Sequence, residues 1–338
     1  MMKQVLGSLA RIADFDATPF EVARIPRSDW ETGDYVQGKV TGEPTRLYHI
    51  ESLSGDMVEV APGDLVIGAF GHRAATLEGV GSWMEIDGGK MNAMTSAGLF
   101  GRFTSVSRLL PRPMSLQYTG HVLRAGRKVC MRDYALVAAP HELDVATILM
   151  VGTSMSAGKT MVGKFACQIL SDLGYRVIGT KLTGAGRYRD ILSFLKTGAT
   201  EIFDFVDAGL PSTVCPESRF RQALDLLLSR IAACEADVLV VEAGASPLEP
   251  YNGAALVNRL GKLTRFTLLC ASDPYAVLGV QTAYGEHMKA DLVAGPAANT
   301  TAATRLVREL SGHQAMNLLD RNTYPELVGL LKSALQLD

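Results

Sequence analysis

The sequence contains no run of about 18 apolar residues, so it offers no candidate for a membrane-spanning helix. A basic excess is also missing, because 33 Lys and Arg residues face 35 Asp and Glu residues and the formal net charge is −2. Surfaces that bind nucleic acid or anionic membranes usually need such an excess. We therefore expect neither a nucleic-acid partner nor a membrane partner.

Cysteine is scarce and scattered: the five cysteines form no Cys-x-x-Cys pair, and the six histidines show no metal-ligand spacing. This pattern argues against a disulfide framework and a zinc site, and it predicts reduced cysteines in a cytoplasmic protein. A Gly-x-Ser-x-Gly motif is absent as well, which disfavours a serine hydrolase of the α/β type. The hydrophobic share of 47% and the charged share of 20% are ordinary for a globular chain.

The chain changes character near residue 140. Residues 1–140 contain short β-type runs separated by Gly, Pro and Asp, and eight glycines fall between Gly68 and Gly101. Each glycine inside a helix costs roughly 1 kcal/mol relative to alanine, so long helices are disfavoured in that stretch. This part predicts a smaller, mostly-β domain of barrel-like or sandwich-like form, whose role the sequence does not indicate.

Residues 141–338 instead alternate apolar strand-like runs with helical patterns. Strands are predicted at 146–151, 175–180, 238–241, 266–270, 291–294 and 316–319, with helices after the first strand and at 223–234, 301–310 and 324–335. Apolar strands with intervening helices indicate a mostly parallel sheet flanked by helices, which is an α/β domain.

A phosphate-binding loop follows the first of these strands. Its sequence is close to the G-x-x-x-x-G-K-[ST] pattern, with Thr153 standing where the first glycine is expected. Small residues let successive backbone N–H groups turn toward phosphates, while the lysine contacts the β- and γ-phosphates and the threonine hydroxyl holds Mg²⁺. We expect a P-loop NTPase-type domain whose nucleotide phosphates are bound by Gly152, Thr153, Ser154, Met155, Ser156, Ala157, Gly158, Lys159 and Thr160.

Four charged residues after strand-like runs are further candidates, because the carboxyl ends of parallel strands share one edge of a sheet. Glu242 ends an apolar strand, where it would hold Mg²⁺ with Thr160 or cap the following turn. Asp204 and Asp207 would supply a second carboxylate to Mg²⁺ or a base, or else are solvated loop residues. Lys181 would neutralise a substrate carboxylate, or is an ordinary lysine at a strand end.

The loop from Gly152 to Thr160 resembles that of dethiobiotin synthetase and the cobyrinic acid synthetase-like enzymes. Residues 238–245 resemble the strand of those enzymes that ends in Glu-Gly-Ala-Gly, which implies Mg²⁺ binding by Glu242. Asn299 resembles their adenine-contacting Asn, and this implies ATP as the nucleotide. Residues 180–184 resemble their Lys-Pro-x-x-x-Gly segment with Leu182 in place of proline, which implies that Lys181 lies near a substrate carboxylate.

A second resemblance lies in the middle of the domain. Residues 204–209 and 298–301 are similar to the P-loop half of the D-glutamate N-acetyltransferase-like family. The usual N-terminal half of that family is Rossmann-like, and the β-rich residues 1–140 do not match it. The resemblance therefore covers about residues 145–335.

These resemblances imply an ATP- and Mg²⁺-dependent enzyme of the ligase or synthetase type that activates a small-molecule carboxylate by phosphoryl transfer. Its expected catalytic residues are Lys159, Lys181, Asp204 and Asp207. Two alternatives stay open at this point. One is an acetyl-CoA-dependent N-acetyltransferase acting on an amino acid, with the loop gripping the CoA diphosphate. The other is a nucleotide-binding regulatory protein. A homodimer is also left open.

Overall fold

The computed structural model describes residues 2–45, 47–284 and 289–336. The chain divides into two compact units. The β unit comprises Met1–Ala138, Ala185–Arg189 and Phe205–Leu227, and the P-loop unit comprises Ala139–Gly184, Asp190–Asp204 and Leu228–Asp338. Neither unit is therefore one continuous stretch of chain.

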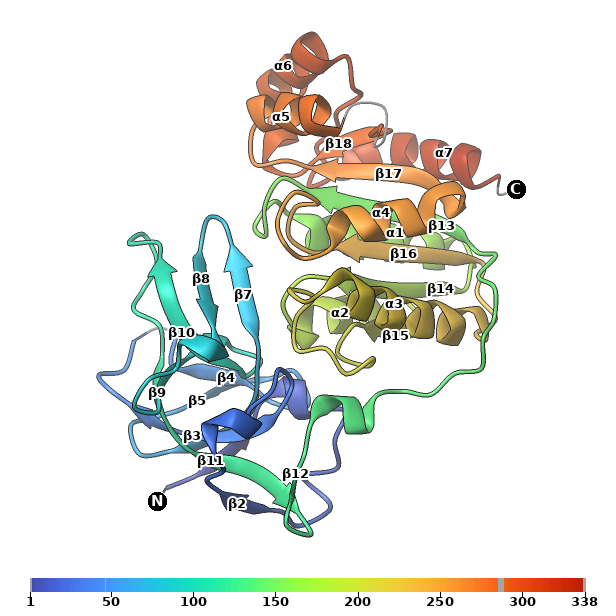
Figure 1. Ribbon diagram of the computed structural model, residues 1–338. Coiled ribbons are helices and arrows are strands. Elements are labelled where there is room, and N and C mark those ends of the chain that lie inside the picture. Colours follow the sequence, from blue (N-terminus) through green and yellow to red (C-terminus); the bar gives the residue numbers. More distant parts are fainter. Residues whose placement is uncertain (1, 46, 285–288, 337–338) are drawn as a thin grey trace. The chain divides into compact units, whose positions relative to one another are not determined.

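The P-loop unit contains a six-stranded sheet in the order β15-β14-β16-β13-β17-β18, and every pair of neighbouring strands is parallel (Figure 1). The strands are β13 (Ala146–Gly152), β14 (Val177–Thr183), β15 (Glu201–Asp204), β16 (Val238–Ala243), β17 (Thr264–Cys270) and β18 (Leu292–Ala294). This parallel sheet confirms the expected α/β class.

Helices connect and flank these strands (Figure 1). They are α1 (Lys159–Asp172), α2 (Tyr188–Leu195), α3 (Glu217–Ala232), α4 (Gly253–Leu260), α5 (Pro274–Tyr284), α6 (Thr301–Ser311) and α7 (Tyr324–Leu335), with short 3-10 turns at η5 (Gly261–Leu263), η7 (Pro296–Ala298) and η8 (Arg321–Thr323). Among the residues described, no helix combines the length and apolar composition that a membrane crossing requires.

Full burial explains why the strands of this sheet could be recognised. Every residue of β16 is buried, which matches its nearly continuous apolar run; β14 is buried as well, although it carries Thr180, Lys181 and Thr183. The predicted strand at 316–319 is wrong: only an isolated bridge joins Val293 to Ala315, and the Met316 N–H then donates to the Val293 carbonyl at 3.0 Å. The strand β15 and the helices α2, α4 and α5 were not predicted, because each carries too short or too weak a pattern.

The described residues of the β unit form twelve strands. They are β1 (Gln4–Leu6), β2 (Glu21–Ala23), β3 (Tyr35–Thr41), β4 (His49–Glu51), β5 (Met57–Glu59), β6 (Leu65–Phe70), β7 (His72–Ala75), β8 (Gly79–Ser82), β9 (Lys90–Thr95), β10 (Leu99–Val106), β11 (Ser115–Arg124) and β12 (Arg127–Lys128), with 3-10 turns η1 (Ser8–Ala10), η2 (Arg27–Asp29), η3 (Trp83–Glu85) and η4 (Met131–Tyr134).

Five of these strands close into a ring, which decides between the barrel-like and sandwich-like forms. The strand β6 pairs with β3, β3 with β11, β11 with β9, β9 with β10, and β10 again with β6. Buried apolar side chains from the ring, among them Val36, Val66, Phe70 and Phe100, form its core. The glycine-rich stretch lies in β6 to β10 because close approach demands it: a Cβ at Gly68 would lie 2.2 Å from the Gly98 carbonyl oxygen.

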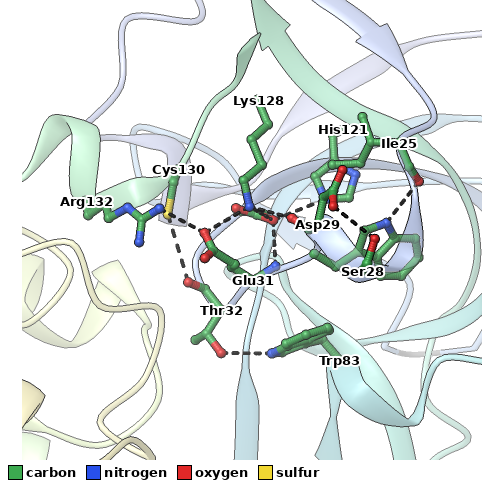
Figure 2. Close-up of polar contacts among 12 residues, drawn as sticks. Ile25, Ser28, Asp29, Glu31, Thr32, Trp83, His121, Lys128, Cys130 and Arg132 are labelled. Carbon is green, nitrogen blue, oxygen red and sulfur yellow. Dashed lines mark hydrogen bonds and ion pairs between the residues drawn. The ribbon is translucent and has the colours of Figure 1, made fainter.

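A buried polar cluster ties the segment before β3 to β11 and β12 (Figure 2). Asp34 and His121 are completely buried, and His121 Nε2 lies 3.3 Å from Asp34 Oδ2. Lys128 Nζ lies 3.1 Å from the same carboxylate oxygen and 2.9 Å from Glu31 Oε2. The Tyr118 hydroxyl lies 2.6 Å from His121 Nδ1. The cluster therefore joins three parts of the unit, with Asp34 and His121 inside it and Lys128 and Glu31 partly exposed at its edge.

A second histidine of the β unit lies between two hydroxyl groups. His72 Nδ1 lies 2.9 Å from Ser82 Oγ, and Nε2 lies 3.1 Å from Thr32 Oγ1. Thr32 Oγ1 also accepts a hydrogen bond from Trp83 Nε1 at 2.8 Å (Figure 2). Burial of the ring, together with the nearby Arg219 charge, lowers the pKa of His72 below its ordinary value of 6.5. The folded unit therefore favours the neutral ring.

We expect protonation of His72 to destabilise the fold as the pH falls. Because the pKa is lower in the folded chain than in the unfolded chain, the contribution of His72 is fully present above about pH 6.5 and is lost below it. His72→Gln should therefore reduce the loss of stability between about pH 7 and pH 5. Urea unfolding of both proteins at several pH values measures this difference, and the same pH dependence in both would contradict the expectation.

Candidate functional site

The P-loop runs from the end of β13 to the first residue of α1. Gly158 has φ +92° and is the N-cap of α1, so the glycine before the lysine is needed for its left-handed backbone. Gly152 is needed for space, because a Cβ there would lie 2.6 Å from Lys159 Nζ. Thr153, which replaces the usual first glycine, accepts a hydrogen bond at its hydroxyl from the Ser272 N–H at 3.1 Å. Its own N–H donates to the Cys270 carbonyl at 3.1 Å, so this residue fastens the loop to the end of β17.

The loop that follows β18 lies against the P-loop. Gly295 has φ +83°, and a Cβ there would lie 2.5 Å from the Ala157 carbonyl oxygen. Asn299 follows η7 in the same loop; its side chain is exposed, and its carbonyl accepts a hydrogen bond from Asn317 Nδ2 at 3.1 Å. The adenine contact predicted for Asn299 stays a prediction, and the residue is exposed and therefore accessible to a ligand.

Lys159 is 2% exposed. Its ammonium donates to the Ser154 carbonyl at 2.6 Å, and among the residues described no carboxylate lies within 4.0 Å of it. Burial lowers the pKa of Lys159, an effect that the nearby Glu242 charge opposes. A buried cation without a close anion costs free energy, so this site favours an anionic ligand at the loop.

Thr160 and Glu242 form the donor set that could hold a divalent cation. The Thr160 hydroxyl donates to Glu242 Oε2 at 2.9 Å, and Glu242 is 3% exposed at the end of β16, the strand beside β13. Burial raises the pKa of Glu242, and the Lys181 charge acts in the opposite direction. Hard oxygen atoms from a hydroxyl and a carboxylate suit Mg²⁺, so these two residues fit the ion that the motif implies.

The sheet register brings two more predicted residues to the same edge. Lys181 on β14 is paired with Asp204 on β15 and with Glu242 on β16, so the three side chains leave the same face of neighbouring strands. All three are buried. Lys181 Nζ also lies 2.5 Å from Asp190 Oδ2, in the first turn of α2. Sequence reasoning missed Asp190, since an acidic residue in a first helical turn is common and only the fold shows its partner.

The remaining predicted residue, Asp207, lies in the β unit. Its carboxylate forms an ion pair with Arg11 at 2.7 Å, and its carbonyl accepts the Leu136 N–H at 2.8 Å. The structure therefore brings together Lys159, Thr160, Lys181, Asp204 and Glu242 in the P-loop unit. Asp207 and its partner Arg11 both belong to the β unit.

Comparison with known proteins gives distant structural likenesses. No family model matches the sequence, and no curated protein matches it. A solved structure of chloroplast FtsY from Physcomitrella patens is similar with a TM-score of 0.39 and 12% identity over 57% of this chain and 67% of that one. HypB from Helicobacter pylori, in complex with nickel, is similar with a TM-score of 0.38 and 16% identity over 57% of this chain and 87% of that one.

A third similar structure is a DUF1611 family protein from Anabaena variabilis, with a TM-score of 0.37 and 16% identity over 59% of this chain and 61% of that one. TM-scores below 0.5 do not establish a common fold. The assignment of a P-loop NTPase-type fold therefore rests on the parallel sheet, the strand–loop–helix connection and the geometry of the loop itself.

We expect Gly152→Ala to weaken nucleotide binding with little effect on folding, because the added Cβ would displace the Lys159 ammonium. A charge-assisted contact is worth roughly 1.5–3 kcal/mol, so its loss lowers the affinity for ATP about tenfold or more. Gly279→Ala in α5 is the matched control, since a Cβ there meets no atom within 4 Å. Titration calorimetry compares the two variants, and equal affinities would refute the role of Gly152.

Proposed function

We propose that this chain binds a nucleoside triphosphate with Mg²⁺ at the P-loop and transfers the γ-phosphoryl group to a small molecule. The observation that carries the proposal is the buried Lys159 ammonium, which donates to the neutral Ser154 carbonyl in the phosphate loop. The P-loop NTPase-type fold indicates nucleotide binding in general. The transfer step and its acceptor belong to the proposal.

Each part of the loop has a role in this proposal. The loop N–H groups and the positive end of α1 would hold the phosphates, and Lys159 would balance their charge. Thr160 and Glu242 would hold Mg²⁺, which when bound offsets negative charge on the phosphates. The chain's own contribution is positioning and charge, which is what phosphoryl transfer mainly requires.

We take ATP as the nucleotide. Asp273, the first carboxylate after β17, caps α5: Oδ1 accepts the Tyr275 and Ala276 N–H groups at 2.9 and 3.0 Å, and Oδ2 accepts the Ser272 hydroxyl at 3.0 Å. The two neighbouring donors of guanine would have to compete with these three donors for the Asp273 carboxylate. That competition supports adenine, as does the exposed Asn299 residue.

The acetyl-CoA alternative is less well supported by the site. A buried carboxylate at Glu242 next to the Thr160 hydroxyl would repel a diphosphate unless a cation lay between them. That arrangement suits the β- and γ-phosphates of a nucleotide with Mg²⁺.

The ligase-type reaction, in which a substrate carboxylate takes the phosphoryl group, has its own requirement: the substrate must displace Asp190 from Lys181.

We expect Lys159→Ala to lower the affinity for ATP with Mg²⁺ by about tenfold or more, because a charge-assisted contact worth roughly 1.5–3 kcal/mol is lost. Titration calorimetry with ATP, GTP and acetyl-CoA measures the effect and ranks the three ligands. Lys164→Ala, which removes a lysine later in α1, is the control. Unchanged affinity for all three ligands in Lys159→Ala would remove the basis of the proposal.

Thr160→Ala and Glu242→Gln should each raise the Mg²⁺ concentration that half-saturates ATP binding, because each removes one oxygen donor of the proposed ion site. Glu309→Gln, which removes an exposed carboxylate from α6, should leave the Mg²⁺ dependence unchanged. Titration of Mg²⁺ at fixed ATP measures the shift. The same Mg²⁺ dependence in wild type and both site variants would show that the ion binds elsewhere.

A further inference from the structure

Lys181 is surrounded by the protein's own carboxylates. Its Nζ lies 2.5 Å from Asp190 Oδ2, and its two register partners on the neighbouring strands are Asp204 and Glu242. Burial alone would lower the pKa of Lys181, but the Asp190, Glu242 and Asp204 charges raise it above its ordinary value. The lysine therefore stays protonated and its charge is already balanced.

The Lys181 charge is already balanced by carboxylates of the protein. Asp190 forms the ion pair, and Asp204 and Glu242 flank the lysine in the strand register. A substrate carboxylate would have to displace Asp190 or share Lys181 with it, and burying an unpaired charge is costly.

The shape of the site holds Lys181 in this arrangement. A Cβ at Gly244 would lie 3.0 Å from Lys181 Cε, and one at Gly184 would lie 3.2 Å from the same atom. Gly244 is needed first for the backbone, since its Cβ would lie 2.2 Å from the Thr183 carbonyl oxygen, and both glycines leave room beside the Lys181 side chain. Its ammonium is directed to Asp190, whose side chain is 16% exposed, whereas Asp204 and Glu242 are more deeply buried.

A carboxylate and a neutral O–H group, the two classes of phosphoryl acceptor, need opposite surroundings. A carboxylate nucleophile has no proton to lose and needs a cation to receive it. A water or alcohol O–H group is neutral and needs a base for its proton. At this site Lys181 is already paired, and its partner Asp190 is a partly accessible carboxylate held in place by the ion pair.

We propose that the acceptor of the phosphoryl group is a neutral O–H group, water or an alcohol, and that Asp190 takes its proton while Lys181 positions Asp190. This inference rests on the proposed phosphoryl transfer. The acceptor oxygen forms a bond to the γ-phosphorus as its O–H bond breaks and the proton passes to the Asp190 carboxylate. The bond from the γ-phosphorus to the bridging oxygen breaks, and its electron pair leaves with ADP. With water as acceptor, the products are ADP and phosphate.

The test uses the full chain with ATP, Mg²⁺ and water as the acceptor. Asp190→Asn should lower kcat for ADP formation by at least about 100-fold, while KM for ATP with Mg²⁺ and the calorimetric affinity stay within about twofold, because proton acceptance acts on the reacting group. Asp190→Glu should restore part of kcat. Asp172→Asn, at the exposed end of α1, is the matched control and should keep wild-type kcat. Thermal unfolding of each variant checks that the fold is retained.

A second arm supplies succinate and hydroxylamine, which converts an acyl phosphate into a hydroxamate, and a third arm supplies glycerol. ATP-dependent hydroxamate from the wild type would overturn the inference in favour of a carboxylate acceptor. An unchanged kcat in Asp190→Asn would also overturn it, as would ATP binding without ADP formation in both water and glycerol.

Failure of the wild type to bind ATP with Mg²⁺ would instead refute the proposed function itself. Formation of glycerol phosphate in the third arm would identify an alcohol acceptor. Release of phosphate without glycerol phosphate would identify water. Either result supports the inference.

Discussion

Burial of the Lys159 ammonium is the constraint on which the chemistry of the P-loop unit depends. A lysine that is 2% exposed loses most of its hydration, and the Ser154 carbonyl replaces only part of it. The remaining stabilisation has to come from negative charge at the loop. The loop N–H groups and the N-terminal end of α1 act in the same direction, so these features all favour a polyphosphate.

The second buried lysine meets the same physical problem by a different route. Lys181 is stabilised by an ion pair with Asp190 and by carboxylates on both neighbouring strands. The two lysines therefore differ in what they offer a ligand. The charge of Lys159 is available to pair with an anionic ligand, whereas the charge of Lys181 is paired with Asp190. Residue type alone does not distinguish these roles, since both residues are lysines of the same unit.

A few glycines leave the space that the buried lysines and the closed ring of strands require. Gly152 leaves room for the Lys159 side chain, and Gly244 leaves room for Lys181. In the β unit, Gly68 allows the chain around Gly98 to approach β6 within the closed ring of strands. Each position tolerates no Cβ without a shift of its neighbour, so the spacing of glycine in the sequence reflects close packing as well as turns.

The sequence by itself determined the alternation of apolar strands and helices after residue 145 and the position of the phosphate loop. Both are local patterns: full burial makes strands such as β16 continuously apolar, and a loop of small residues before Lys159 and Thr160 has few other uses. The approximate place of Glu242 also followed, because a strand end in a parallel sheet lies at the ligand edge. Membership in any one P-loop family did not follow from these patterns.

Only the tertiary structure decided which charges meet. Asp190 is paired with Lys181, although the two lie nine positions apart in the sequence and in different elements, whereas Asp207 is paired with Arg11 in the β unit. The closure of five β-strands into a ring was likewise beyond the sequence, since β6 and β10 are joined by long-range hydrogen bonds that no local pattern encodes. Strand register and chain closure depend on contacts between distant residues, and a single sequence read by its local periodicity holds no record of them.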